Sequence, residues 1–148
     1  MKKINIILIV LLTGILSCNQ NTNNIYSEAK KIYDESIKVH DEVMPLMGKI
    51  MDLQQTLKNK KEEITEEAKI DQINITLQNL ENAHNAMMHW MKNLAPIPEE
   101  PKDDPDSSYL PSRDEMLKIQ ERSLEEVKKV KEVILGSIDK AETLISSL

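Results

Sequence analysis

The sequence predicts an all-α protein: an antiparallel up-down-up bundle of three helices, with a Pro-kinked first helix and a long Pro-rich loop between the second and third helices. Apolar residues recur at steps of three and four along three separate stretches, which is the spacing of one helical face. Aromatic residues make up 3% of the chain, with no Phe, which is unusual for a β-sandwich. Hydrophobic residues at 40% and charged residues at 30% are typical of a folded domain rather than a disordered chain.

Composition also limits the function. A formal net charge of −6 disfavours non-specific binding to nucleic acid, so we expect no nucleic-acid partner. The single Cys excludes an intramolecular disulfide and a zinc site built from cysteines. The chain contains no nucleophile elbow, P-loop or HExxH motif, so we expect a protein that is not an enzyme.

The first segment, residues 1–17, predicts a secretory signal peptide. Two lysines precede an apolar stretch over residues 4–12 that is too short to span a bilayer. Residues 15–18 (ILSC) resemble the lipobox of bacterial lipoprotein signals, although the first two residues depart from its commonest form. The resemblance implies that Cys18 becomes the lipidated N-terminus of the mature chain, which makes the membrane a partner. The alternative is an ordinary secretory peptide with an incidental cysteine.

Residues 18–24 predict a short connection between the membrane and the folded domain. After the lipidated Cys18, the run NQNTNN over residues 19–24 is polar and uncharged, which is typical of a flexible tether. Loss of the signal removes two lysines and makes the chain more acidic. We therefore expect acyl chains, rather than a basic face, to hold the protein at the membrane. The helical domain then covers residues 25–148.

The first predicted helix covers residues 25–57. Two neighbouring apolar stripes run along it: Ile25, Ala29, Ile32, Ser36, Val39, Val43, Leu46, Ile50, Leu53 and Leu57 in one, and Tyr26, Tyr33, Ile37, His40, Met44, Met47 and Met51 in the other. Pro45 has no amide hydrogen and leaves the carbonyl of Asp41 without its helical donor, so we expect a kink there that Gly48 eases. A full break at Pro45 is the alternative.

The second predicted helix covers residues 66–94. A highly charged stretch over residues 58–69 precedes its apolar part, and we place the turn near Lys60–Thr65. The apolar stripe of this helix consists of Ile70, Ile73, Leu77, Leu80, His84, Met87, Met91 and Leu94. The sequence Ala95-Pro96 ends the helix, because the residue before a proline disfavours helical geometry.

A Pro-rich acidic loop over residues 95–112 leads to the third helix. Loops of this length inside a small domain are usually functional or disordered, and composition does not decide between the two. Ser112 and Glu115 have the spacing of a capping box, which predicts that a helix begins there. Its apolar stripe is Met116, Ile119, Ser123, Val127, Val130, Ile134, Ile138, Ala141, Ile145 and Leu148. An open helical hairpin that dimerises through the same stripes is the alternative to a three-helix bundle.

One pattern of residues could carry chemistry. The spacing H-x3-M-x2-M occurs twice, once on each of the first two helices: His40, Met44 and Met47, and His84, Met88 and Met91. Steps of four and three place each set on one helical stripe. A turn near residue 63 would pair His40 with Met88 and Met44 with His84. Imidazole and thioether groups suit Cu(I), and His and Met also ligate haem iron.

The simpler interpretation of this pattern is core packing, because Met is an ordinary core residue where Phe is absent. We therefore expect no cofactor, with copper or haem as the alternative. A di-iron centre is disfavoured, because Glu81 and His84 form only one of the two E-x-x-H motifs that it needs. His89 and Trp90 lie off the stripe, where we expect them at the surface or against the loop.

Two segments carry a family resemblance: HDEVMPLMGKIMDL over residues 40–53 and NAHNAMMHWM over residues 82–91. They are similar to short helical lipoproteins of flavobacteria and related Bacteroidetes, some of which are labelled "viral A-type inclusion protein". The resemblance implies a helical fold and a lipoprotein's location but no substrate. Surface-exposed lipoproteins of that lineage have an acidic run after the Cys, which is missing here. This favours the periplasm-facing side of the outer membrane.

These observations together predict a lipid-anchored helical bundle of the cell envelope that acts as a binding or scaffold module. The partner would be an envelope protein or a second copy of the chain. A partner helix lying along the Met-rich stripe requires that Met44, Met47 and Met88 be exposed. The rival function is Cu(I) or haem binding through the paired His and Met residues.

Overall fold

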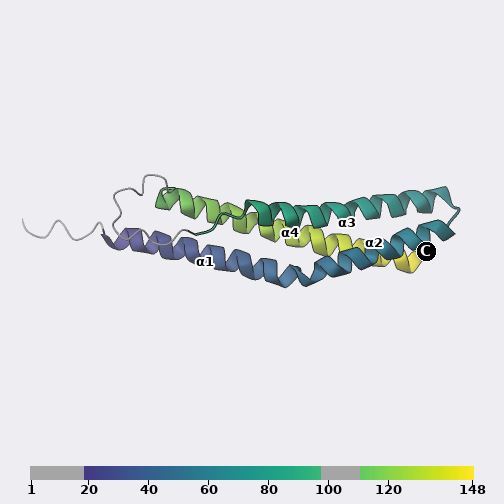
Figure 1. Cartoon of the computed structure of the whole chain (residues 1–148), viewed down its shortest axis with the longest axis horizontal. Coiled ribbons are helices and arrows are strands. Elements are labelled where there is room, and N and C mark those ends of the chain that lie inside the picture. The colour runs from purple at the N-terminus through teal and green to yellow at the C-terminus, as the bar shows by residue number, and fades with distance from the viewer. Residues whose placement is uncertain (1–18, 98–110) are drawn as a thin grey trace, which may run out of the picture.

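A computed structural model describes residues 19–97 and 111–148 of the chain. The predicted signal peptide, Cys18 and most of the Pro-rich loop lie outside these residues. The described part is all-helical: α1 covers Asn19–Val43, α2 Pro45–Glu63, α3 Glu67–Asn93 and α4 Arg113–Ser147. Because α1 and α2 are joined with a bend of 35°, they form one long helix, and the fold consists of three helices without strands in the described residues. Figure 1 shows them lying along a common long axis.

The bend between α1 and α2 follows from Pro45, as the sequence predicts. The helix continues through the bend instead of breaking, because Met44 keeps helical dihedral angles and its amide donates to the carbonyl of His40 at 2.9 Å. The amide of Met47 then donates to the carbonyl of Met44 at 3.1 Å, which tightens the turn around the proline. A Cβ added to Gly48 would meet no atom within 4 Å, so the surroundings of Gly48 do not require a glycine.

The start of α1 differs from the tether predicted for residues 19–24. The structure extends the helix back to Asn19. Neither Pro nor Gly occurs in this stretch, and each residue added to an existing helix gains a hydrogen bond without a new nucleation cost. A polar stretch with the composition of a linker can therefore extend a helix whose later residues pack against the bundle.

The connection between α2 and α3 lies at residues 64–66, at the C-terminal end of the predicted turn. Lys60–Glu63 are helical, because no Gly or Pro stops α2 and lysine and glutamate are good helix formers. Ile64 and Glu66 adopt extended geometry, and Ile64 packs against the core. Lys61 Nζ donates to Asn74 Oδ1 at 2.7 Å and joins the two helices close to the turn.

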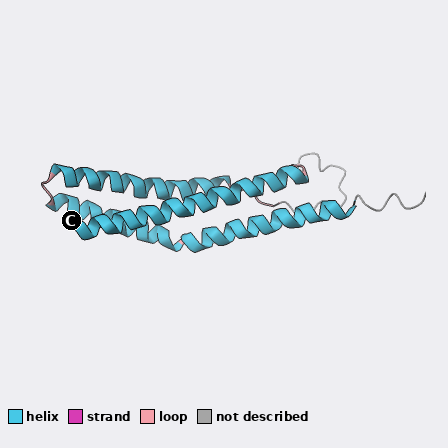
Figure 2. Cartoon of the chain, turned by 180° about the vertical axis from the view of Figure 1, so that it is seen from behind, coloured by secondary structure: helices cyan, strands magenta, loops and turns pink. Residues whose placement is uncertain are grey.

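The core lies along one face of every helix. Its buried apolar residues include Val39, Val43, Met47, Ile50, Leu57, Ile73, Leu80, Ala83, Met87, Trp90, Val127, Ile134, Ile138 and Ala141. Most of them belong to the predicted stripes, which confirms the helical bundle. Helix α4 packs against all three other helices, and Figure 2 shows it lying against both α1 and α3. The backbones of α1 and α3 do not approach each other closely within the described residues.

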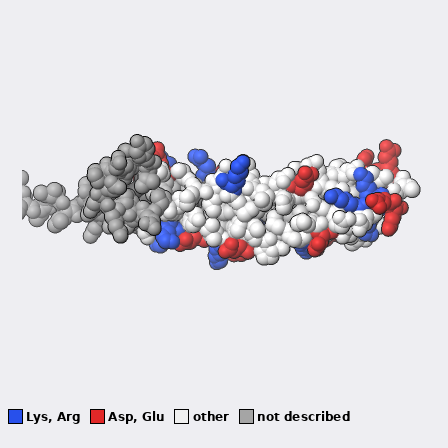
Figure 3. All heavy atoms as spheres, viewed as in Figure 1, with Lys and Arg blue, Asp and Glu red and all other residues white. Residues whose placement is uncertain are grey.

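Ion pairs join the exposed edges of α4 to the first long helix. Glu35 pairs with Lys128 at 2.7 Å, and Lys49 pairs with Glu142 at 2.6 Å. Such exposed pairs contribute little stability each. Figure 3 shows Lys, Arg, Asp and Glu side chains interspersed along this face of the molecule. None of the described helices carries an apolar stretch sufficient to cross a bilayer.

Candidate functional site

The densest group of functional side chains surrounds His40, which lies half-buried in the last turn of α1. Its Nδ1 lies 2.9 Å from Asp41 Oδ1, and its Nε2 lies 3.2 Å from Met91 Sδ on α3. The imidazole also stacks on the indole of Trp90, with ring centroids 5.7 Å apart and an angle of 30° between the planes. Long side chains therefore join α1 and α3 at this level, although the described backbones of the two helices do not approach each other closely.

Trp90 holds one side of this group in place. Only 3% of its surface is exposed, and its Nε1 donates to the backbone oxygen of Ser123 at 3.0 Å and to Ser123 Oγ at 3.1 Å. Trp90 therefore does not lie at the surface, which is one of the two positions predicted for it, and most of the loop, the other predicted neighbour, lies outside the described residues. The buried face of α3 includes the small Ala83 and the polar Thr76, which the apolar stripe left out, and steps of three and four from these residues lead to Trp90. His89 is exposed, as expected.

The two H-x3-M-x2-M sets contribute to the structure unequally. His40 and Met91 are in contact, whereas Met47 is buried in the core with 8% of its surface exposed. Met44 is half-buried against that core, and 49% of Met88 is exposed. The predicted exposure of the Met-rich stripe is therefore wrong for Met47, which belongs to the hydrophobic core, and Met44 is exposed only in part.

The register between the helices also differs from the predicted one. His40 contacts Met91, three residues beyond the expected Met88, and His84 lines a hollow between α2 and α3 together with Met51. The reason is that the turn lies at residues 64–66, further along the chain than the turn centre used for the prediction. Because the centre of the turn lies one to two residues further along the chain, each facing position moves by about two to four residues, or at most about one helical turn.

His84 lines a second feature, which we call the α2/α3 groove. This shallow groove has a volume of about 410 Å³ and lies between the two helices beyond the bend. Its lining residues are Met51, Gln54, Lys58, Leu77, Glu81, His84 and Asn85. Met51 has 61% of its surface exposed, and the exposed Met88 lies one helical turn beyond His84 on α3. The groove thus combines two apolar side chains, Met51 and Leu77, with polar and charged ones that include Lys58 and Glu81.

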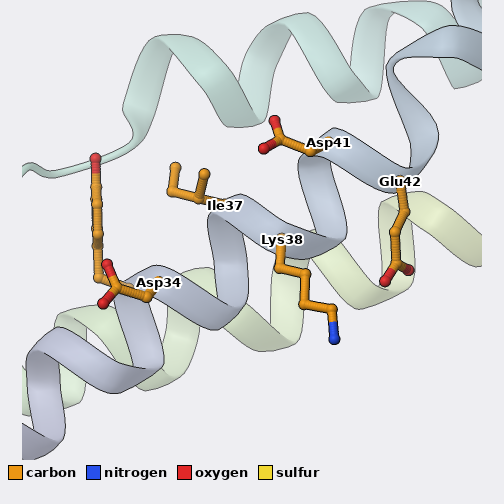
Figure 4. A pocket seen from close by; sticks show the side chains of 6 residues that line it. Asp34, Ile37, Lys38, Asp41 and Glu42 are labelled. Carbon is orange, nitrogen blue, oxygen red and sulfur yellow. The ribbon is translucent and has the colours of Figure 1, made fainter.

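A third hollow, of about 680 Å³, lies along α1. All of its described lining residues belong to α1: Tyr33, Asp34, Ile37, Lys38, Asp41 and Glu42. Figure 4 shows Ile37 and Asp41 pointing to one side of the helix and Lys38 and Glu42 to the other. Glu42 accepts a hydrogen bond from Lys131 at 2.6 Å, and this contact and the lysine charge hold the pKa of Glu42 below its usual value. Asp41 connects this hollow to the His40 group.

Sequence reasoning also missed a buried polar side chain at the end of the bundle. Gln120 has 1% of its surface exposed, and its Nε2 donates to the carbonyl of Ala95 at 3.0 Å. Its Oε1 is buried and has no hydrogen-bond partner among the residues that the structure describes. The sequence does contain the pattern that places Gln120 on the buried face. Steps of four, three and four link Met116, Gln120, Ser123 and Val127 on one side of the helix.

The described residues contain no group of three or more His, Cys, Asp or Glu side chains placed to hold one metal ion. A metal bound there would need thioether ligands beside imidazole, and His40 with Met91 is the pair that the structure brings into contact. Neither protein-family models, nor curated proteins, nor solved structures showed a match to this chain.

Proposed function

We propose that the protein is a lipid-anchored binding or scaffold module of the cell envelope and is not an enzyme. Lipid on Cys18 attaches it to the periplasm-facing side of the outer membrane, and the helical bundle presents the α2/α3 groove to a partner. The observation that carries the anchor is the order of a basic start, a short apolar stretch and a lipobox-like sequence before the only Cys. Two acyl chains are enough for stable attachment.

The finer architecture in this proposal is the antiparallel up-down-up bundle. Two sets of contacts support it. The residue numbers of the ion-paired partners rise together on the first long helix and α4, from Glu35 with Lys128 to Lys49 with Glu142. This order is expected for helices that run in the same direction. Between the first long helix and α3, the residue number rises on one helix and falls on the other, from His40 with Met91 to Lys61 with Asn74. This order is expected for an antiparallel α3.

The binding role rests on two exposed methionines at the α2/α3 groove and beside it. Met51, which lines the groove, has 61% of its surface exposed, and Met88, one helical turn beyond the lining residue His84, has 49% exposed. Flexible thioether side chains adapt to partner surfaces of different shape, and a groove between two helices accommodates an amphipathic partner helix. The partner in this proposal is therefore a helix or peptide of an envelope protein.

The anchor is tested in a bacterium that processes lipoproteins. Cys18→Ser should move the protein from the membrane fraction to the soluble fraction and abolish its labelling by a radioactive fatty acid. Ser17→Ala is the matched control, because it keeps a small residue before the cysteine and should leave both properties unchanged. Equal membrane association of the Cys18→Ser protein would contradict lipid attachment at this residue.

The groove is tested by placing a photo-crosslinking amino acid at position 88 in living cells. We expect a discrete adduct with another protein that disappears when Met51→Glu is added, because a buried negative charge disfavours an apolar contact. The matched control is the same crosslinker at position 125, on the exposed face of α4. An adduct that forms equally at positions 88 and 125, or that survives Met51→Glu, would contradict binding in the groove.

A further inference from the structure

The hydrogen-bonding partners of His40 are unusual, because both ring nitrogens face atoms that only accept. Nδ1 lies 2.9 Å from a carboxylate oxygen of Asp41, and Nε2 lies 3.2 Å from the thioether sulfur of Met91. A neutral imidazole carries one N–H and can satisfy one of these two acceptors. If Nδ1 donates to Asp41, the lone pair of Nε2 points at the lone pairs of the sulfur. A cation placed between Nε2 and Sδ satisfies both.

We infer that Nε2 of His40 and Sδ of Met91 form a binding site for Cu(I). Imidazole and thioether are the ligands that select this soft ion over harder divalent ions. Metal bonds of about 2.0 Å to nitrogen and about 2.3 Å to sulfur fit a pair of atoms at this separation, at a bent angle that leaves room for a third ligand. The inference does not depend on the proposed lipid anchor or on the α2/α3 groove.

Asp41 and Trp90 complete the site without binding the metal. A histidine that binds a metal commonly donates its other N–H to a carboxylate, which fixes the tautomer and the ring orientation, and Asp41 occupies that position. Trp90 covers one face of the imidazole and is itself held by its two hydrogen bonds to Ser123. The imidazole is thus positioned on one face and at one nitrogen, while Nε2 remains directed at Met91.

Met44 is the candidate for the third ligand. It lies one helical turn after His40 and is half-buried against the core. Its amide already donates to the carbonyl of His40, so the backbone that links the two side chains is fixed. A second thioether would complete a site with one nitrogen and two sulfur ligands. This assignment uses His40, Met44 and Met91 from the two repeated motifs and leaves out His84, which lines the α2/α3 groove.

The fluorescence of Trp90 provides the test, because it is the only Trp in the chain and its ring stacks on His40. The full chain carrying Cys18→Ser, which removes the thiol as a competing ligand, is titrated anaerobically with Cu(I) in detergent. We expect quenching that saturates at one equivalent. His40→Phe, which keeps a ring against Trp90, and Met91→Leu, which conserves volume, should abolish the saturable quenching.

Three further proteins separate this site from other causes of quenching. His84→Phe and Met88→Leu, the corresponding changes in the other motif positions, should leave the titration unchanged. Asp41→Asn should weaken Cu(I) binding by about ten-fold, because it removes the carboxylate that orients the imidazole. The inference is overturned if the parent shows no saturable quenching, if His40→Phe and Met91→Leu titrate like the parent, or if Zn²⁺ quenches as effectively as Cu(I). A change in emission produced by protons but not by Cu(I) also overturns it.

Discussion

The side chains around His40 are held by packing on three helices, so their geometry depends on residues that have no polar role. Trp90 is the central one, because its ring contacts His40 on α1 and its Nε1 is bonded to Ser123 on α4. The repeated His and Met spacing indicated which residues could meet. It could not indicate which pairs do meet, because the register depends on the position of a turn without Gly or Pro.

Replacement of Trp90 by Phe should destabilise the bundle. The change removes the Nε1 donor, which costs about 1 kcal/mol for a lost hydrogen bond, and leaves unfilled volume in the core, which adds to the loss. Chemical denaturation followed by circular dichroism at 222 nm measures the difference in the free energy of unfolding. Ser123→Ala keeps the backbone acceptor and should cost less. A Trp90→Phe protein as stable as its parent would show that this contact between α3 and α4 contributes nothing.

Replacement of a motif methionine by Ala should lower the free energy of unfolding strongly where the methionine is buried and little where it is exposed. Met47→Ala should lower the free energy of unfolding by about 2 to 5 kcal/mol, because Met47 is buried and its loss leaves a cavity. Met88→Ala should change it by no more than about 0.5 kcal/mol, because half of Met88 faces solvent. Urea denaturation of the two variants provides the comparison. Equal losses would contradict the orientation of α2 after the bend.

Gln120 illustrates why part of the core could not be assigned from residue types. The apolar stripe predicted for the last helix contains Ile119, yet Ile119 has 36% of its surface exposed and the neighbouring Gln120 is buried. The buried face follows helical geometry rather than hydrophobicity at each position. Gln120 is accommodated because its amide nitrogen bonds to the carbonyl of Ala95, which follows α3.

At the scale of the elements, α4 begins where its sequence predicts. Ser112 Oγ accepts a hydrogen bond from the Glu115 amide at 3.3 Å, and the Glu115 carboxylate accepts one from the Ser112 amide at 2.9 Å. This confirms the capping box. The start of α1 has no comparable signal in the sequence and lies six residues before the predicted one. Helix α3 covers Glu67–Asn93, within one residue of the predicted range at each end, although Glu66 forms no side-chain cap.

Loss of the cap should weaken α4. Ser112→Ala removes the acceptor for the Glu115 amide and should lower the free energy of unfolding by about 1 kcal/mol. Thermal or urea denaturation measures the loss. Ser147→Ala, at the exposed opposite end of the same helix, is the matched control and should change stability by less than about 0.5 kcal/mol. A Ser112→Ala protein that matches this control would contradict a stabilising role for the capping box.

The capping box should also make stability dependent on acid. Hydrogen bonds from the backbone amide and then the hydroxyl of Ser112 hold the pKa of Glu115 below its ordinary value of 4.5. The stabilisation is therefore complete above that ordinary value and is lost as the pH falls through the lowered pKa of the folded state. Glu115→Gln keeps the capping geometry but does not titrate. Its stability relative to the parent should rise as the pH falls below 4.5, and a constant difference would contradict this linkage.

At the scale of the whole molecule, α4 is the helix that joins the others. It packs on the first long helix along one side and on α3 along another. Helical periodicity predicted three amphipathic helices and the proline bend, because both depend on local sequence. It could not predict which helix contacts both of the others or which grooves stay open, because those properties depend on how the apolar faces meet in space. The α2/α3 groove, with Met51 at its edge, is a result of that arrangement.

The central proposal places this bundle at the membrane through one residue, Cys18. The most direct measurement is the mass of the N-terminal peptide of the protein isolated from the envelope of the cells that produce it. We predict a peptide that begins at Cys18 and carries the mass of its attached acyl chains. A mature chain that begins at another residue, or an N-terminal peptide in which Cys18 carries no lipid, would contradict the proposal.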